Sequence, residues 1–144
     1  MIEIRESVES HIPGILDMLG QLWPTHEHSP ESLTTVLRRG LASDHQFFLT
    51  ALEGESVVGF CALMIRNNLW QAANVGHMDE LVVNAEHRGQ GLGKLLMERI
   101  IEVAVSQGCV RLELETAFHR KDAHRFYEQN GFESRGLLFS KPIG

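Results

Sequence analysis

The feature that most constrains the fold is a glycine-rich segment, residues 88–93, that stands between two runs of different hydrophobic period. Before it, residues 75–83 are rich in apolar and β-branched side chains, which predicts a strand. After it, apolar side chains recur at helical spacing, at Leu92, Leu95, Leu96, Ile100, Val103 and Ala104. This run continues to Gln107, and Gly108 is a typical helix end. The chain is therefore predicted to contain a strand, glycine turn and helix in direct succession.

Glycines at such a junction let backbone N–H groups approach a ligand closely, and a helix N-terminus favours anions. We therefore expect a phosphate or pyrophosphate here, although a glycine turn without a ligand is the simpler alternative. The segment is not a Walker loop, because Arg88 stands at the position of its first glycine and Leu95 at that of its Ser or Thr. The dinucleotide fingerprint fails because Lys94 occupies the place of its third glycine. A phosphotransferase is accordingly disfavoured.

The rest of the chain alternates between strand and helix signals. Strands are expected near residues 2–8, 47–52, 57–65 and 110–114, with one or two closing strands over 132–140. Helices are expected near residues 11–22, 30–39 and 121–130, the first capped by Ser10 and the second capped by Ser29 and ended by Gly40. No repeat or linker interrupts this order. It predicts one α/β domain with a mixed sheet over residues 1–144.

Composition narrows the function. The 144 residues include 13 Lys and Arg against 19 Asp and Glu, a formal charge of −6, which disfavours a broad nucleic-acid-binding face. Cys61 and Cys109 lie in apolar runs, which favours buried thiols in a reducing compartment. No apolar run approaches the ~18 residues of a membrane span, and no secretory leader is apparent. We expect a cytoplasmic protein with neither nucleic-acid nor membrane partners.

The motifs around the glycine segment resemble those of the GCN5-related N-acetyltransferases (GNAT). The pattern Arg88-x-x-Gly91-x-Gly93 follows an apolar strand and precedes residues 123–127 (AHRFY) and 131–132 (GF). Within the superfamily, residues 79–83 and 121–127 look most like the aminoalkylphosphonate N-acetyltransferases. The resemblance runs nearly end to end. It implies a three-layer α/β (α+β) fold, whose central mixed and mostly antiparallel sheet is flanked by four helices.

The same resemblance implies acetyl-coenzyme A (acetyl-CoA) as the acetyl donor. Backbone amides of the glycine segment would hold its pyrophosphate, and the strand before it would pair with its pantetheine arm. The coenzyme-binding positions implied in this way are Leu81, Val82, Val83, Arg88, Gly89, Gln90, Gly91, Leu92, Gly93, Lys94 and Tyr127. One position departs from the family pattern, because Arg120 stands where many members carry Asn. The resemblance therefore does not by itself imply a side-chain contact from this position to the pantetheine arm.

Acetyl transfer to an amine requires a base, because an amine with a pKa near ~10.4 is protonated at neutral pH. Glu80 is the predicted general base, since it lies on the strand that would present the acetyl group and its charge attracts a cationic substrate. In a regular strand Asp79 would face the opposite side, but a bulge would reverse this assignment. A solvated or salt-bridged Glu80 is the simpler alternative.

The leaving thiolate requires a proton, and the family pattern places Tyr127 beside the sulfur as general acid. The simpler reading of Tyr127 is an aromatic side chain that packs with Phe126 and Phe132. A backbone N–H near Val82 would meet the charge that develops on the thioester oxygen. Direct attack by the amine is favoured over an acyl-enzyme, because both cysteines lie in apolar runs that suggest no thiolate.

The histidines and basic residues define further candidates. His26-Glu27-His28 invites a metal hypothesis, with His45 and His77 as distant partners, but its spacing lacks a helical pair with a third ligand, and we expect no metal. If the substrate carries a phosphonate, we expect its binding groups in residues 23–28 or in the basic segment 119–125. The expected acceptor is a small primary amine, with aminoalkylphosphonate as the leading choice. Acetylation of a protein or peptide amine, or a non-catalytic coenzyme A-binding regulatory module, are the alternatives; the resemblance also allows a homodimer.

Overall fold

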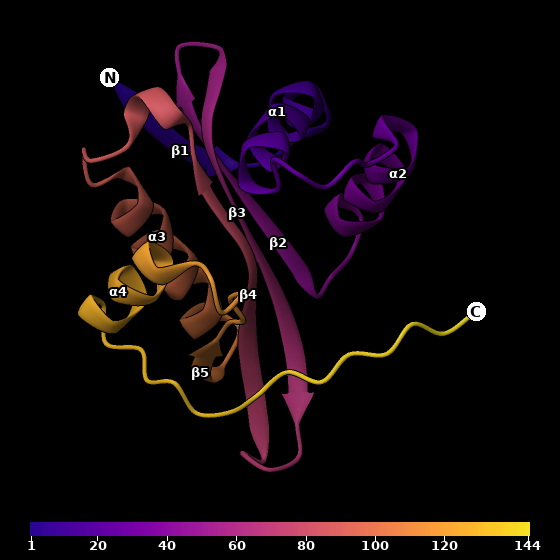
Figure 1. The fold of residues 1–144 in the computed structure, drawn as a ribbon, viewed down its shortest axis with the longest axis vertical. Helices are drawn as coiled ribbons and strands as arrows, with labels where there is room; N and C mark the ends of the chain where they lie inside the picture. The colour runs from indigo at the N-terminus through magenta and orange to yellow at the C-terminus, as the bar shows by residue number, and fades with distance from the viewer. The chain divides into compact units, whose positions relative to one another are not determined.

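The computed structural model describes all 144 residues and divides them into two compact units, residues 1–113 and 114–144. The first unit contains β1 (Ile2–Glu6), α1 (Ile12–Leu22), α2 (Pro30–Leu41), β2 (Gln46–Glu53), β3 (Ser56–Asn68), β4 (Ala73–Val83), α3 (Leu92–Ser106) and β5 (Cys109–Glu113). Two short 3₁₀ helices, Glu9–His11 and Ala85–His87, precede α1 and α3. The second unit contains α4 (Lys121–Gln129) (Figure 1). The four predicted α-helices are therefore confirmed.

The strands form one sheet in the order β1-β2-β3-β4-β5. Neighbours from β1 to β4 are antiparallel, whereas β4 and β5 are parallel. The longest pair is β3 and β4, whose long hairpin runs through the sheet (Figure 1). The prediction of a mixed, mostly antiparallel sheet is confirmed.

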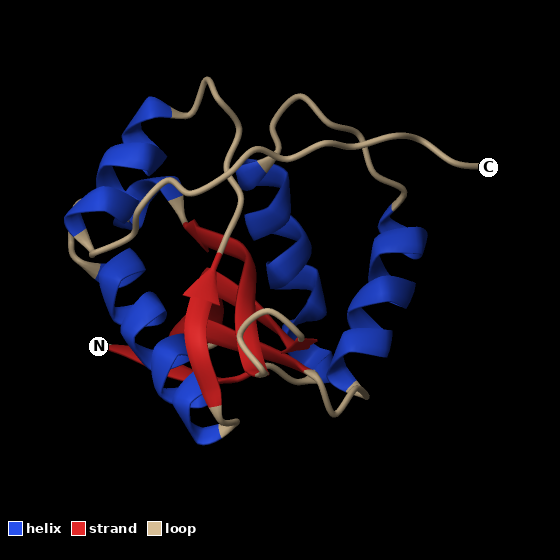
Figure 2. Ribbon diagram, turned by 90° about the horizontal axis from the view of Figure 1, so that it is seen from below, coloured by secondary structure: helices blue, strands red, loops and turns tan.

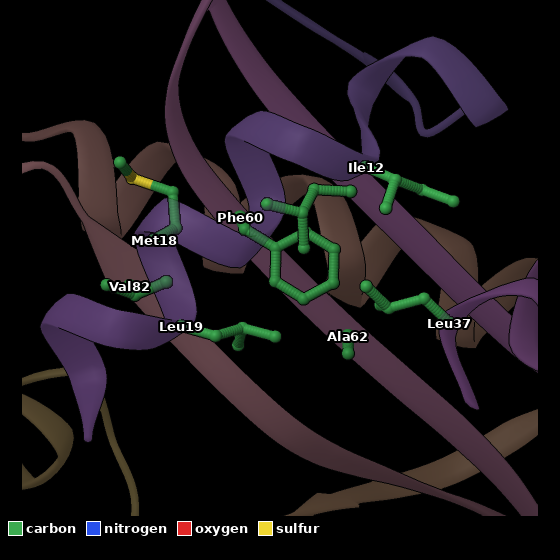
Figure 3. Packing of buried hydrophobic residues seen from close by; sticks show 8 residues of the cluster. Ile12, Met18, Leu19, Leu37, Phe60, Ala62 and Val82 are labelled. Carbon is green, nitrogen blue, oxygen red and sulfur yellow. The ribbon is translucent and has the colours of Figure 1, made fainter. Parts of the chain in front are cut away.

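Helices cover both faces of this sheet (Figure 2). On one face, Ile15 of α1 and Leu37 of α2 belong to the same buried cluster as Phe60 of β3. Figure 3 shows the Phe60 ring in the middle of this cluster. The neighbouring residue on β3, Gly59, points toward α3, because a Cβ there would meet the Leu96 side chain at 2.9 Å. Since successive strand residues face opposite sides, α1 and α2 lie on one face and α3 on the other.

Helix starts were predicted with mixed success. The Ser29 hydroxyl accepts a hydrogen bond from the Ser32 N–H at 3.3 Å, so Ser29 caps α2 as predicted. The prediction that Ser10 caps α1 is wrong, because Ser10 lies inside the 3₁₀ helix Glu9–His11. The Nδ1 atom of His11 accepts the Val8 N–H at 3.1 Å instead. The His11 side chain thus satisfies the Val8 N–H, which would otherwise be left to water.

The prediction that Gly40 ends α2 is also wrong, because the helix continues to Leu41. Gly40 is buried, and a Cβ at this position would lie 2.2 Å from the Phe48 ring. This glycine lets α2 approach β2 closely instead of providing a left-handed helix end.

No strand forms over residues 132–140, so the predicted closing strands are wrong. The apolar side chains of this segment, Leu137, Leu138 and Phe139, are consecutive rather than alternating, and all three are exposed. Gly136 and Pro142 flank them and disfavour regular pairing. The observed order therefore ends with α4.

Candidate active site

The glycine segment forms an open turn at the start of α3. Asn84 caps the preceding 3₁₀ helix by accepting the Glu86 N–H at 2.9 Å, and Arg88 Nε donates to the Val83 carbonyl at 3.2 Å. Gly89 and Gly91 have φ angles of +80° and +81°, which other residues rarely adopt. Apart from the adjoining residues of the chain, no heavy atom lies within 4 Å of the Cβ position at either glycine. The turn thus leaves room beside the first backbone N–H groups of α3, which suits a pyrophosphate.

The strand before this turn has an unpaired edge. β5 pairs with β4 only as far as His77, opposite Glu113, where β5 ends. Beyond that point, residues 78–83 keep β3 as their partner on one side. Every second N–H and C=O of this stretch points away from β3. These groups could pair with an extended ligand such as a pantetheine arm, and Leu81, Val82 and Val83 all lie in this stretch.

A bulge interrupts β4 at Asp79. Leu63 of β3 lies opposite Met78, whereas the preceding residue, Ala62, lies opposite Glu80. Asp79 is therefore the extra residue of the bulge. Because directly opposite residues share a face, Glu80 lies on the same face as Ala62, which is the α1 and α2 face. The expectation of a regular strand is therefore wrong at Asp79, and the alternation of faces from which Asp79 and Glu80 were assigned does not hold there. The register itself still places Glu80 on the α1 and α2 face.

Glu80 is the most perturbed carboxyl group of the site. Burial, followed by repulsion from the Asp79 carboxylate, raises the pKa of Glu80 to about 7, and His77 acts in the opposite direction. His77 is buried, and its Nδ1 atom lies 2.7 Å from Asp79 Oδ1. A carboxyl group with a pKa near neutrality can accept a proton and release it again at physiological pH.

Tyr127 lies on α4 in the second unit, between two aromatic neighbours. Its ring centroid is 5.5 Å from that of Phe126 and 5.7 Å from that of Phe132, both tilted edge to face. This is the packing that the simpler reading predicts, and it fixes the orientation of the ring. The predicted role of Tyr127 as general acid stays a prediction.

The other candidates remain near the surface. In the loop between α1 and α2, the rings of His26 and His28 lie 4.1 Å apart, and Trp23 lies 5.1 Å from His28. In the second unit, His124 Nε2 contacts the Ala117 carbonyl at 2.9 Å, and Arg125 forms an ion pair with Asp122. No group of three or more His, Cys, Asp or Glu side chains gathers in an arrangement that could hold a metal ion.

Sequence reasoning missed the link between His77 and Asp79. It considered His77 only as a distant metal ligand, although residues two apart on a strand share a face and can pair. The spacing His-x-Asp next to the predicted base was the available signal. The bulge itself left no such signal, because one extra residue in a strand changes neither composition nor local polarity.

Comparison with known proteins agrees with this geometry. The sequence pattern of the Acetyltransferase (GNAT) family matches residues 12–132. The chain is 30% identical to a glucosamine 6-phosphate N-acetyltransferase from Trypanosoma brucei brucei, over 92% of this chain and 90% of that protein. It is 37% identical to an aminoalkylphosphonate N-acetyltransferase from Salmonella typhimurium, over 65% of this chain and 60% of that protein.

A similar solved structure is that of a transcriptional regulator from Bacillus halodurans C-125, with a TM-score of 0.92 and 27% identity. The match covers 99% of this chain and 100% of that one. The two chains therefore have the same fold.

Proposed function

This chain belongs to the GNAT family of acetyl-CoA-dependent N-acetyltransferases, and we propose that it acetylates a small primary amine by direct attack. In this proposal Glu80 is the general base and Tyr127 the general acid. Glu80 accepts a proton from the substrate ammonium group, directly or through a water molecule. The amine nitrogen then forms a bond to the acetyl carbon as the carbon–sulfur bond breaks, and Tyr127 donates a proton to the leaving thiolate. The second proton, which the nitrogen loses as it becomes an amide, returns through water to the Tyr127 phenolate, and Glu80 releases its proton to solvent. A backbone N–H near Val82 donates to the thioester oxygen.

The observation that carries this proposal is the position of Glu80. It combines a pKa raised to about 7 with a place on the stretch of β4 whose outer edge is unpaired by β5. A general base works best when its pKa is near the operating pH. The unpaired edge and the open turn at Gly89 and Gly91 offer a path for the pantetheine arm and pyrophosphate of the donor.

For the acceptor, we propose an amine that also carries a phosphorus oxyanion, with an aminoalkylphosphonate as the leading choice. Glucosamine 6-phosphate and aminoalkylphosphonates, the acceptors named for the two relatives, share this chemistry. In this chain, the exposed loop that contains His26 and His28 offers two imidazole rings near Trp23. Imidazole N–H groups can donate to a phosphonate, more strongly when the ring is charged.

The acceptor is tested by measuring thiol release from acetyl-CoA with a panel of amines. We expect turnover with aminoalkylphosphonates and glucosamine 6-phosphate, and a much lower kcat/KM with ethanolamine and glucosamine, which lack the oxyanion. A preference for peptides would indicate a protein or peptide acetyltransferase instead. Tight coenzyme A binding without turnover of any amine would indicate a non-catalytic regulatory module.

The role of Tyr127 is tested by Tyr127→Phe, which keeps the aromatic packing and removes only the hydroxyl. We expect kcat to fall by roughly 10²-fold, the lower end of the range for general acid–base catalysis, with little change in acetyl-CoA affinity. Phe126→Leu on the same helix is the control for altered packing. An unchanged kcat in Tyr127→Phe would exclude Tyr127 as the acid.

We also propose that residues 1–144 act as one acetyltransferase domain in the cytoplasm, without nucleic-acid or membrane partners. The family match across both compact units supports a single functional domain. No helix of the structure is both long and apolar enough to cross a membrane. A homodimer is compatible with this proposal, and light scattering of the purified chain tests it.

A further inference from the structure

His77 and Asp79 are two polar groups next to Glu80 that the proposed reaction does not use. His77 is 8% exposed, although histidine is polar, and its Nδ1 atom lies 2.7 Å from Asp79 Oδ1. The Asp79 side chain is 34% exposed. An ionised carboxylate can only accept a hydrogen bond, so the Nδ1 atom of His77 donates. The hydrogen bond therefore ties a buried ring to the more exposed residue of the bulge.

The bulge decides where His77 and Glu80 point. In a regular strand, residues three apart face opposite sides of the sheet. Here Met64 lies opposite His77 and Ala62 lies opposite Glu80, and these two β3 residues share a face. His77 and Glu80 are therefore neighbours on the α1 and α2 face, because Asp79 is inserted between them. Without the bulge, one of the two would face α3.

Asp79 and His77, both on β4, are the charged neighbours that shift the pKa of Glu80, after the larger effect of burial. On β3, the neutral Cys61 thiol is close enough for its own pKa to be raised by Glu80 and Asp79, again after the larger effect of burial. The α1 and α2 residues in the core cluster on this face are apolar. Asp79 and His77 thus shift the pKa of Glu80 in opposite directions.

We propose that Asp79 is a positioning residue of the acetyl-transfer site and not its base. Its hydrogen bond to His77 holds the bulge that turns Glu80 toward the α1 and α2 face, and its negative charge keeps Glu80 ready to accept a proton at neutral pH. His77, held beside Glu80, opposes the effect of the Asp79 charge. The inference rests on the proposed role of Glu80 as the base.

The first test compares pH profiles of kcat/KM for four variants. Asp79→Asn keeps an oxygen that can accept from His77 but removes the charge, so the acidic limb should move to lower pH. His77→Gln removes the imidazole, so the limb should move to higher pH. Asp44→Asn, an exposed residue in the turn before β2, is the control and should leave the limb in place. Asp79→Asn should keep most of the plateau rate, whereas Glu80→Gln should lose roughly 10²- to 10⁴-fold.

The opposite shifts exclude a merely structural role, which would lower the plateau of both variants without moving their limbs in opposite directions. A plateau loss in Asp79→Asn as large as that expected for Glu80→Gln, with Glu80→Gln active, would instead identify Asp79 as the base. Shifts of the same sign, or none, would overturn the proposal. If one of the two variants does not fold, the direction in which the acidic limb of the other moves still tests the proposal.

The second test does not depend on turnover. The ¹³C chemical shift of the Glu80 carboxyl carbon is titrated in wild type, Asp79→Asn and His77→Gln. We expect the midpoint to fall in Asp79→Asn and to rise in His77→Gln. If these midpoints move as expected but no amine is acetylated, the proposed function fails while the link between Asp79, His77 and Glu80 stands. If the midpoints stay fixed in variants that acetylate the amine, the link between Asp79, His77 and Glu80 fails while the proposed function stands.

Discussion

The two halves of β4 have the same neighbour on one side but different surroundings on the other. Residues 74–77 form the stretch that pairs with both β3 and β5, and Val75 and Gly76 are buried there. Residues 78–83 pair with β3 alone among the strands, contain the bulge and hold Glu80. The paired half has its backbone groups satisfied within the sheet and contributes to stability. The other half has backbone groups that no second strand pairs and a carboxyl group with a raised pKa, both of which cost stability.

The largest effect is expected from a substitution in residues 78–83, the half of β4 that β5 does not pair, and it is an effect on catalysis. Glu80→Gln keeps the size of the side chain and removes its ability to accept a proton. We expect kcat/KM at pH 8 to fall by roughly 10²- to 10⁴-fold, measured by thiol release with the best acceptor of the panel. Glu98→Gln on the exposed side of α3 is the matched control and should retain the wild-type rate. An active Glu80→Gln enzyme would remove Glu80 from the mechanism.

The same variant should be more stable than wild type at alkaline pH. The pKa of Glu80 is about 7 in the folded chain and 4.5 in the reference state, so the folded chain binds the proton more tightly. Its contribution is favourable at low pH and is lost as the pH rises from about 4.5 through 7. The difference corresponds to about 3 kcal/mol, so Glu80→Gln should raise the free energy of unfolding at pH 8 by up to that amount. Urea unfolding at pH 5 and pH 8 measures this; an equal effect at both pH values would contradict it.

The smallest effect concerns the paired half, where a mutation should change stability alone. Val75 is 1% exposed. Val75→Ala removes two methyl groups from the core and should lower the free energy of unfolding by about 2 kcal/mol. The pH profile of kcat/KM should remain that of wild type, because the charges around Glu80 are unchanged. A moved acidic limb in Val75→Ala would show that the two halves are coupled.

Local signals in the sequence predicted most of the fold. Gly89 and Gly91 adopt positive φ angles at the predicted turn, and Ser29 caps the predicted helix. These features depend on the conformational preferences of one residue and its nearest neighbours. The errors arose where distant residues decide. Gly40 stands inside α2 because the Phe48 ring occupies the space of its side chain.

The candidate site was predictable in its residue types but not in its geometry. Carboxylates at Asp79 and Glu80 on an apolar strand indicate a base, but only the pairing with β3 shows that Asp79 is the extra residue. The raised pKa of Glu80 comes first from burial, which depends on how the surrounding elements pack. The acceptor specificity is less accessible still, because it depends on surface loops whose sequence has no regular pattern.

The two cysteines differ in exposure, so their alkylation rates can report local opening of the structure. Cys61 is fully buried and burial raises the pKa of its thiol, so it is protected from alkylation twice over, whereas Cys109 is partly exposed. Cys61 lies opposite Leu81 across β3 and β4. Two residues from Gly59 on β3, Cys61 faces α3, so an alkylating reagent modifies it only when this part of the structure opens, at a rate set by the free energy of that opening. Donor binding along β4 would slow this labelling. The alkylation rate of Cys61 thus reports how much of the site is occupied, without any labelled ligand.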